Sequence, residues 1–411
     1  MSEDFERDRS APLAVGPPRS RMSRLDRVRA RRNRNRRRMI GAAAAALLIV
    51  VVVAAVYLGA KLFSGSDGEF AGEGKDDVVI QVHDGDSTTQ IAQTLRDKNV
   101  ISNVKGFVDA AKDNAAIAAI QPGFYTVRTE MSASAAVQRL ADPHNRVGKL
   151  VVPEGRQLDD IAEVGSGKVT DGIFTLIAKA TCVPVNGEQK CVAAEDLRKV
   201  AEQAPADQLN VPPWATQPVA SLGKNHRRLE GLIAPGTWNV DPSASPQEIL
   251  AKLVGQSADH YVAGGLLDTA KAMNMSPYQI LVVGSLVQRE AKPHDFAKVA
   301  RVIYNRLAVP QKLEFDSTVN YPLDRQEVAT TDADRAQVTP WNTYAADGLP
   351  ATPICSPGEE ALAAAERPES GDWLYFVTVD TEGTTLFTRD YQQHLANIEL
   401  AKRNGVLDSA R

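Results

Sequence analysis

The spacing of apolar and polar positions predicts one long apolar run, several short strands and a set of amphipathic helices. Residues 39–60 form 22 consecutive positions without a charge. About 20 such residues span a bilayer, and no face of this run is polar, so the pattern predicts a transmembrane helix rather than a buried globular one. A cleaved signal peptide is the alternative, with residues 57–60 as a poor small-residue cleavage site.

A strand followed by a turn and a helix recurs along the next part of the chain. The segments at 78–82 and 149–152 both lead through a glycine-containing turn into a predicted helix, which begins at Thr88 in the first copy and covers 156–162 in the second. The segments at 123–127 and 236–240 likewise precede helices that end at Leu140 and Leu253. This recurrence predicts an internally repeated small αβ unit.

One helix in the second half of the chain carries an acid on its apolar face. Ser276 is a favourable N-cap and Pro277 suits the first helical position. Val283, Val287 and Glu290 follow at i, i+4 and i+7, so the carboxyl lies on an apolar face and in the last turn. Burial and the helix dipole both raise the pKa of an acid placed there. The alternative is a Glu290 that turns to solvent or pairs with a neighbouring base.

The remaining patterns favour an α+β fold with mixed helices and short hairpins. Residues 296–307 and 359–365 form further predicted helices, and 373–379 with 384–388 form a predicted hairpin before a last helix over 391–403. Residues 165–225 are rich in Gly and Pro and are expected to be an insertion.

Charge distribution predicts how the chain is oriented. The net charge of −4 gives no reason to expect nucleic acid as a partner, but residues 21–38 carry ten arginines and one acid. An arginine excess beside an apolar run keeps that side cytoplasmic. We therefore expect a disordered basic cytoplasmic tail over 1–38, a single plasma-membrane anchor over 39–60, a linker over 61–77 and an extracytoplasmic remainder.

Three cysteines fit that placement. Cys182 and Cys191 flank a turn-rich segment, and an oxidising extracytoplasmic space favours a small disulfide loop there. Cys355 is left over in a proline-rich loop and is expected to be a small, semi-buried apolar residue rather than a nucleophile. No metal or cofactor is expected.

Polar and aromatic residues cluster in the predicted loops between 310 and 357. Residues 312–321 and 339–344 interleave Tyr and Trp with Asn, Thr and Asp. Sugar rings stack on aromatic faces, and hydroxyl and acetamido groups need hydrogen-bonding partners, so this composition suits a sugar-binding cleft. The same residue types also dominate ordinary turns.

Several of these segments, in order, resemble signatures of the YceG-like endolytic murein transglycosylase family. The matching segments are Val152-Pro153-Glu154-Gly155, Leu229-Glu230-Gly231 with Pro235-Gly236-Thr237-Trp238, Val287-Gln288-Arg289-Glu290, Leu313 to Tyr321, Trp341-Asn342-Thr343-Tyr344 and Gly348-Leu349-Pro350. The resemblance covers about residues 78–405 and is weakest over 165–225. Gln288, Gly236 and Ser317 depart from the family pattern, which has Glu, Asp and Pro there.

The resemblance implies a LysM-like region over 78–164, the insertion over 165–225 and a catalytic domain over 226–411. It implies cleavage within peptidoglycan glycan strands to leave 1,6-anhydro-MurNAc ends, with Glu290 as the catalytic acid and termination of nascent strands as the outcome. Gln288 leaves Glu290 as the one acid of its segment, although Asp316 or Glu230 could serve as a second acid in a hydrolase. Residues expected to contact the substrate are Glu230, Asp316, Thr318, Tyr321, Asn342 and Tyr344.

A different class of function remains open at this stage. The LysM-like units could hold glycan beside a peptidoglycan synthase without any catalysis, in a scaffold of the cell-wall synthesis machinery. The two hypotheses share the membrane anchor and the sugar-suited loops. They differ only in the role of Glu290.

Overall fold

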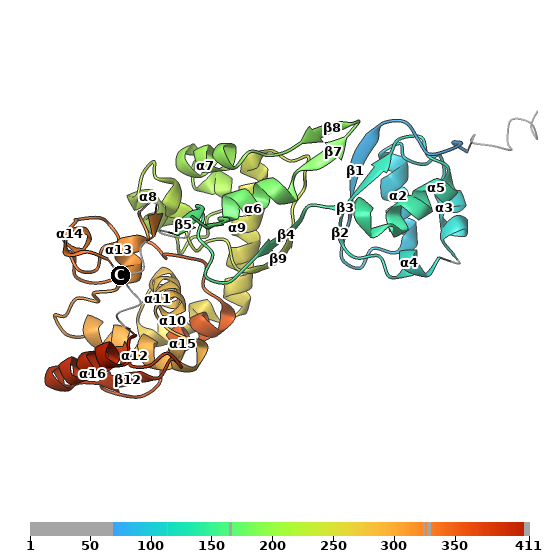
Figure 1. Cartoon of the computed structure of the whole chain (residues 1–411). Helices are drawn as coiled ribbons and strands as arrows, with labels where there is room; N and C mark the ends of the chain where they lie inside the picture. The colour runs from blue at the N-terminus through green and yellow to red at the C-terminus, as the bar shows by residue number, and fades with distance from the viewer. Residues whose placement is uncertain (1–68, 113, 164–166, 324, 327–329, 407–411) are drawn as a thin grey trace, which may run out of the picture. The chain divides into compact units, whose positions relative to one another are not determined.

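The computed structural model describes residues 69–406 except 113, 164–166, 324 and 327–329 (Figure 1). The predicted tail and transmembrane segment, over 1–60, lie outside the described residues, as do positions 61–68 of the linker. Within the part of the chain that the structure describes, no helix has the length and apolar character needed to cross a membrane.

The first αβ unit has its own buried core. Strand β1 (Asp77–Val82) pairs antiparallel with β2 (Gly123–Arg128), and β2 pairs with β3 (Arg146–Val147). The helices between and after these strands are α2 (Thr88–Asp97), α3 (Val104–Ala111), α4 (Ala115–Ala118) and α5 (Ala133–Ala141), followed by the 3-10 turn η1 (Pro143–Asn145). Ser87 and Ser132 cap α2 and α5 with their hydroxyls, and α2 begins at the predicted Thr88.

The second copy of the predicted repeat is present in its strands but not in its first helix. Strand β4 (Lys149–Val152) pairs antiparallel with β9 (Gly236–Asn239), as β1 pairs with β2. Helix α9 (Pro246–Ala263) then follows β9 from a capping box at Ser245, as α5 follows β2. The predicted helix over 156–162 is wrong: the chain there is irregular and enters the short strand β5 (Ile161–Glu163).

Distant contacts explain that difference. The Leu158 amide donates to Glu230 Oε2 at 3.2 Å, and Gln157 Nε2 donates to the Ile354 carbonyl at 3.1 Å. Because the Leu158 amide and the Gln157 side chain bond to residues far along the chain, this segment does not form the i to i−4 hydrogen bonds of a helix.

The described residues of the segment 165–225 pack in the larger of two buried apolar clusters. It contains β6 (Val169–Thr170), α6 (Ile173–Ala180), β7 (Val183–Val185), β8 (Glu188–Lys190), α7 (Ala194–Gln203), the 3-10 turn η2 (Asp207–Leu209) and α8 (Thr216–Ser221). A disulfide joins Cys182 and Cys191 across β7 and β8. Ile173, Phe174 and Leu197 lie in the same buried cluster as the C-terminal helices. Leu150 and Val152 also lie in this cluster, whereas the buried residues up to Leu140 form the first core, so the insertion is part of the larger core.

Helix α11 (Pro277–Glu290) runs through the larger core. It contacts α10 (Leu266–Met273), α12 (Phe296–Leu307) and α15 (Glu359–Glu366), which surround it in Figure 1. The rest of this region comprises the 3-10 turns η3 (His226–Leu229) and η4 (Pro293–Asp295), α13 (Asp316–Asn320), β10 (Arg325–Gln326), α14 (Asp332–Arg335), the hairpin β11 (Tyr375–Thr378) and β12 (Thr385–Thr388), and α16 (Tyr391–Arg403).

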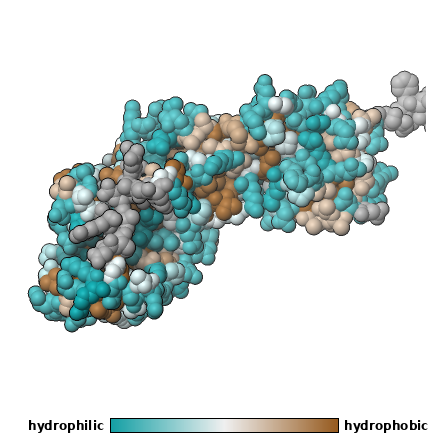
Figure 2. All heavy atoms as spheres, in the orientation of Figure 1, coloured by the Kyte–Doolittle hydropathy of each residue, from teal (hydrophilic) through white to brown (hydrophobic). Residues whose placement is uncertain are grey.

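The architecture is mixed α+β, as the sequence predicts, with small two- and three-stranded sheets between helices. Hydrophilic residues cover most of the face shown in Figure 2, and apolar residues appear there in scattered patches. The buried apolar positions instead gather in the two clusters described above.

Candidate functional site

Glu290 is the last residue of α11, at the end of a helix that is otherwise buried over most of its length. Ser276 and Gln279 form a capping box at the start, with Pro277 at the first helical position. Ile280 to Val287 are all buried, whereas Glu290 is only half-buried. The helix therefore delivers one carboxyl from the core to the edge of a pocket.

The surroundings of Glu290 favour its protonated form. Burial raises the pKa of this carboxyl, and the negative charge of Asp316 raises it further. Contacts from Ser317 and the charge of Arg289 act in the opposite direction. Burial is the largest of these influences, so the pKa of Glu290 lies above its ordinary value. The electrostatic expectation from the sequence is confirmed in direction.

Glu290 opens into a pocket of about 160 Å³ at the end of α11. The hairpin β11–β12 forms the opposite wall. The lining residues are Arg289, Glu290, Ala291, Lys292, Asp295, Val299, Phe376, Thr378, Gly383 and Thr385. Two larger hollows of about 720 and 1060 Å³ lie elsewhere, and neither is lined by Glu290.

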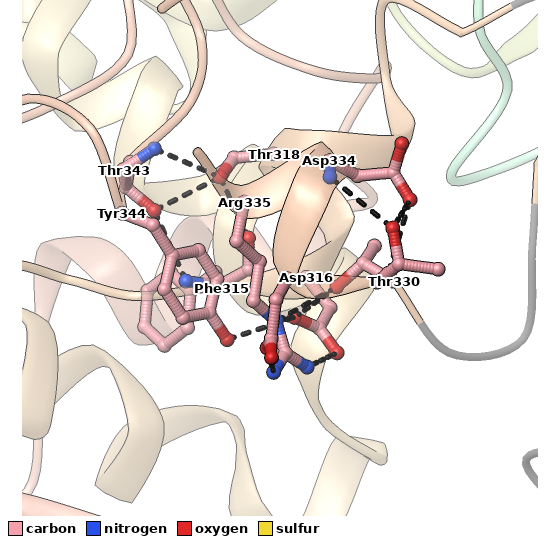
Figure 3. Close-up of polar contacts among 10 residues, drawn as sticks. Phe315, Asp316, Thr318, Thr330, Asp334, Arg335, Thr343 and Tyr344 are labelled. Atoms are coloured by element: carbon pink, nitrogen blue, oxygen red, sulfur yellow. Dashed lines mark hydrogen bonds and ion pairs between the residues drawn. The ribbon is translucent and has the colours of Figure 1, made fainter. Parts of the chain in front are cut away.

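Asp316 is the centre of the polar network drawn in Figure 3, and its charge acts on Glu290. Its Oδ1 accepts hydrogen bonds from Thr330 Oγ1 at 2.8 Å, from the Tyr344 hydroxyl at 2.8 Å and from Arg335 Nε at 3.2 Å. Arg335 Nη2 lies 3.1 Å from Oδ2, and the guanidinium stacks 5.1 Å from the Tyr344 ring centroid. These partners from α13, α14 and the following loop fix the carboxylate and occupy it.

The structure brings Asp316 and Tyr344 to the site but buries the other four residues expected to contact substrate. Thr318 is fully buried and bonds to Phe315 and Thr343. Asn342 is 2% exposed, and its Nδ2 donates to the Gln337 carbonyl at 2.6 Å. In this structure both residues are buried and hold the loops that carry Asp316 and Tyr344.

Glu230 and Tyr321 lie in the core. Glu230 is 1% exposed, and its Oε2 accepts from the Tyr321 hydroxyl at 2.7 Å and from the Leu158 amide. Tyr321 packs edge-on against Trp341. Burial raises the pKa of Glu230 to about 8. This carboxyl therefore joins three segments of the fold and faces protein, not an open pocket.

Gln288 does not line the pocket beside Glu290. Its Oε1 accepts from the Gly358 amide at 2.8 Å, at the start of α15. The residue that departs from the family pattern thus stabilises the N-terminal end of a helix that packs on α11. Cys355 is fully buried, beyond the semi-buried position that the sequence predicts.

Thr330, Arg335 and Lys292 are site residues that the sequence analysis missed. A capping box of Thr331 and Asp334 does begin α14 and was a readable signal for that helix. It predicts the helix but not that Arg335 reaches Asp316, because that contact depends on how two loops pack.

Replacing Asp316 tests whether its charge acts on Glu290. In Asp316→Asn the pKa of Glu290 should fall, because a nearby negative charge has been removed. The basic limb of the pH–rate profile of a reaction that uses protonated Glu290 should then move to lower pH. Thr330→Val removes one hydrogen bond to Asp316 and leaves the Asp316 charge in place, so the basic limb of this variant's profile should not move. An unmoved limb in Asp316→Asn would contradict the assigned coupling.

Comparisons with known proteins agree with the ordered motifs. A profile of the YceG-like family matches residues 80–400. The endolytic murein transglycosylase of Bacillus subtilis (strain 168) is 28% identical over 327 residues, covering 78% of this chain and 84% of the relative. That of Streptococcus pneumoniae serotype 2 is 26% identical over 337 residues, covering 78% of this chain and 58% of the relative. A crystal structure of a yceG-like protein from Listeria monocytogenes superimposes with a TM-score of 0.51 at 26% identity, over 78% of this chain and 99% of that one.

Proposed function

We infer, since this chain belongs to the YceG-like family, that it is an endolytic murein transglycosylase. Relatives in Bacillus subtilis and Streptococcus pneumoniae carry that name. The substrate would be the glycan strand of peptidoglycan, cleaved between MurNAc and GlcNAc within the strand. The observation that carries the proposal is the Glu290 carboxyl, which is delivered by a buried helix to an open pocket and has a raised pKa.

The reaction needs one group that gives a proton and then takes one. Protonated Glu290 donates its proton to the oxygen that links MurNAc C1 to the next GlcNAc, and the C1–O bond breaks. The MurNAc 6-hydroxyl oxygen bonds to C1, and its proton returns to the Glu290 carboxylate. No water is consumed, the product is a 1,6-anhydro-MurNAc end, and the enzyme ends in its starting protonation state.

The other acids near the site do not offer the second free carboxylate of a hydrolase. A glycoside hydrolase uses two carboxyl groups that flank the scissile bond. Asp316 is held by Arg335, Thr330 and Tyr344, and Glu230 is buried. Asp295, the other acid among the pocket residues, is buried and lies 3.2 Å from His294. This arrangement supports the one-carboxyl mechanism.

Mass spectrometry of the cleavage products tests the reaction type. Anhydro ends lack one water relative to reducing ends, so the two chemistries differ in product mass. Purified protein and uncrosslinked glycan strands should yield anhydro ends at internal positions. Reducing ends would instead support hydrolysis, and an uncut strand would support the scaffold hypothesis.

We further propose that the protein is anchored in the plasma membrane by residues 39–60, with the catalytic part outside. The arginine run before this segment and the Cys182–Cys191 disulfide support that orientation. At the membrane the enzyme would meet strands as a synthase extends them, which suits termination of nascent strands. Protease added to spheroplasts should degrade the region after residue 69, and its full protection would overturn this topology.

A further inference from the structure

The mouth of the pocket beside Glu290 carries a lysine with unused hydrogen-bonding capacity. Lys292 is exposed, and its Nζ donates one hydrogen bond, to the Glu382 carbonyl at 3.2 Å. Among the residues that the structure describes, none places a carboxylate within ion-pairing distance of it. An ammonium has three donors, so this cation can still bind an anion that enters the pocket.

The hairpin turn holds Lys292 in place. Gly383, in the turn between β11 and β12, has φ of +95°, and a Cβ at that position would overlap the end of the Lys292 side chain. The absence of a side chain at Gly383 lets the lysine lie across the turn. The ammonium is thereby kept at the pocket instead of extending freely into solvent.

Around Lys292 the pocket lining carries both cations and acids. Arg289 is a second cation in the lining. Of the two acids, Glu290 has a pKa raised by burial, and Asp295 Oδ2 lies 3.2 Å from His294 Nε2. The volume of about 160 Å³ is small beside the roughly 300–1,000 Å³ of ordinary ligand pockets, so it suits one sugar or a substituent of it.

We propose, building on the proposed function, that Lys292 binds a carboxylate carried by the sugar that reacts at Glu290, and so makes the enzyme prefer anionic strands. Two groups of peptidoglycan supply this chemistry. One is the lactyl carboxylate of a MurNAc without a stem peptide, and the other is a carboxylate of the stem itself. Charge-assisted hydrogen bonds to carboxylates are the stronger kind in proteins, although exposure to water limits their contribution here.

Binding to uncleaved strands tests the role of Lys292 apart from catalysis. In a Glu290→Gln background, Lys292→Met should weaken binding about fivefold, the upper end of what an exposed ion pair contributes. Lys292→Arg should retain most of the affinity. Lys298 is the matched control, because its Nζ packs 5.5 Å from the Phe387 ring of the same hairpin without lining the pocket. Lys298→Met should bind like the parent.

The substrate is varied in parallel to separate charge recognition from support of the hairpin. Strands whose carboxylates are converted to amides should bind the Glu290→Gln parent about fivefold more weakly than unmodified strands. The variant that also carries Lys292→Met should bind both kinds of strand with equal affinity. If Lys292→Met also weakens binding to strands without stem peptides, the lactyl carboxylate is the ligand. If it weakens binding only to strands that carry stem peptides, the ligand is a carboxylate of the stem.

Equal weakening of charged and amidated strands by Lys292→Met would show that the lysine only supports the hairpin and would overturn the proposal, as would no weakening at all. Failure of wild-type protein to form anhydro ends would instead overturn the proposed function, and the two results are read from different assays.

Discussion

Glu290→Gln should abolish formation of anhydro-MurNAc ends while leaving the fold and strand binding nearly intact. General acid–base catalysis contributes about 10²- to 10⁴-fold to a rate, and in the proposed mechanism one carboxyl performs both proton transfers. Glutamine keeps the shape of the side chain but cannot donate a proton to the leaving oxygen. Burial raises the pKa of Glu290, and this reduces the electrostatic change that a neutral amide introduces. Products of wild type and variant should be compared by mass spectrometry.

A second variant tests whether position matters more than the presence of an acid. Gln288→Glu restores the acid that the family pattern has two residues earlier, but this side chain faces the Gly358 amide at the start of α15. Adding it to Glu290→Gln should not recover activity. Recovered cleavage in the double variant, or full activity of Glu290→Gln alone, would refute the assignment.

Local sequence signals predicted helix positions correctly where capping residues determine the start of the helix. Helix α11 has the predicted bounds because Ser276 and Pro277 fix its start, and α16 begins at Tyr391 directly after the Asp390 cap. The apolar face of α11 also predicts where Glu290 lies, because the helix period alone places it beside Val283 and Val287.

Sequence signals failed where long-range contacts decide the structure. The segment 156–162 has a helical pattern, but Glu230 and Ile354 bind its polar groups from far along the chain. The composition of the 310–357 loops suggested a row of sugar contacts. Thr318 and Asn342 instead point inward, because buried loops need side chains to satisfy their backbone groups. Composition cannot distinguish these two uses of the same residue types.

Glu230 should make the stability of the protein depend on pH in a direction opposite to that of most acids. Its pKa is about 8 in the folded state and about 4.5 in the unfolded chain. Between these values the folded state holds a proton that the unfolded state has released. The contribution of this group is therefore fully present below pH 4.5 and is lost as pH rises to about 8, with a slope of at most about 1.4 kcal/mol per pH unit.

Glu230→Gln removes this titration and keeps the contacts. The amide oxygen can accept from Tyr321 and Leu158 as Oε2 does, and the amide nitrogen takes the place of Oε1, which has no hydrogen-bond partner among the described residues. Urea unfolding from pH 5 to 9 should show the variant gaining stability over wild type as pH rises. Glu359→Gln, on an exposed side chain, should follow wild type. Parallel curves for wild type and Glu230→Gln would mean that Glu230 is ionised in the folded core, with its charge balanced by neighbours such as Arg227.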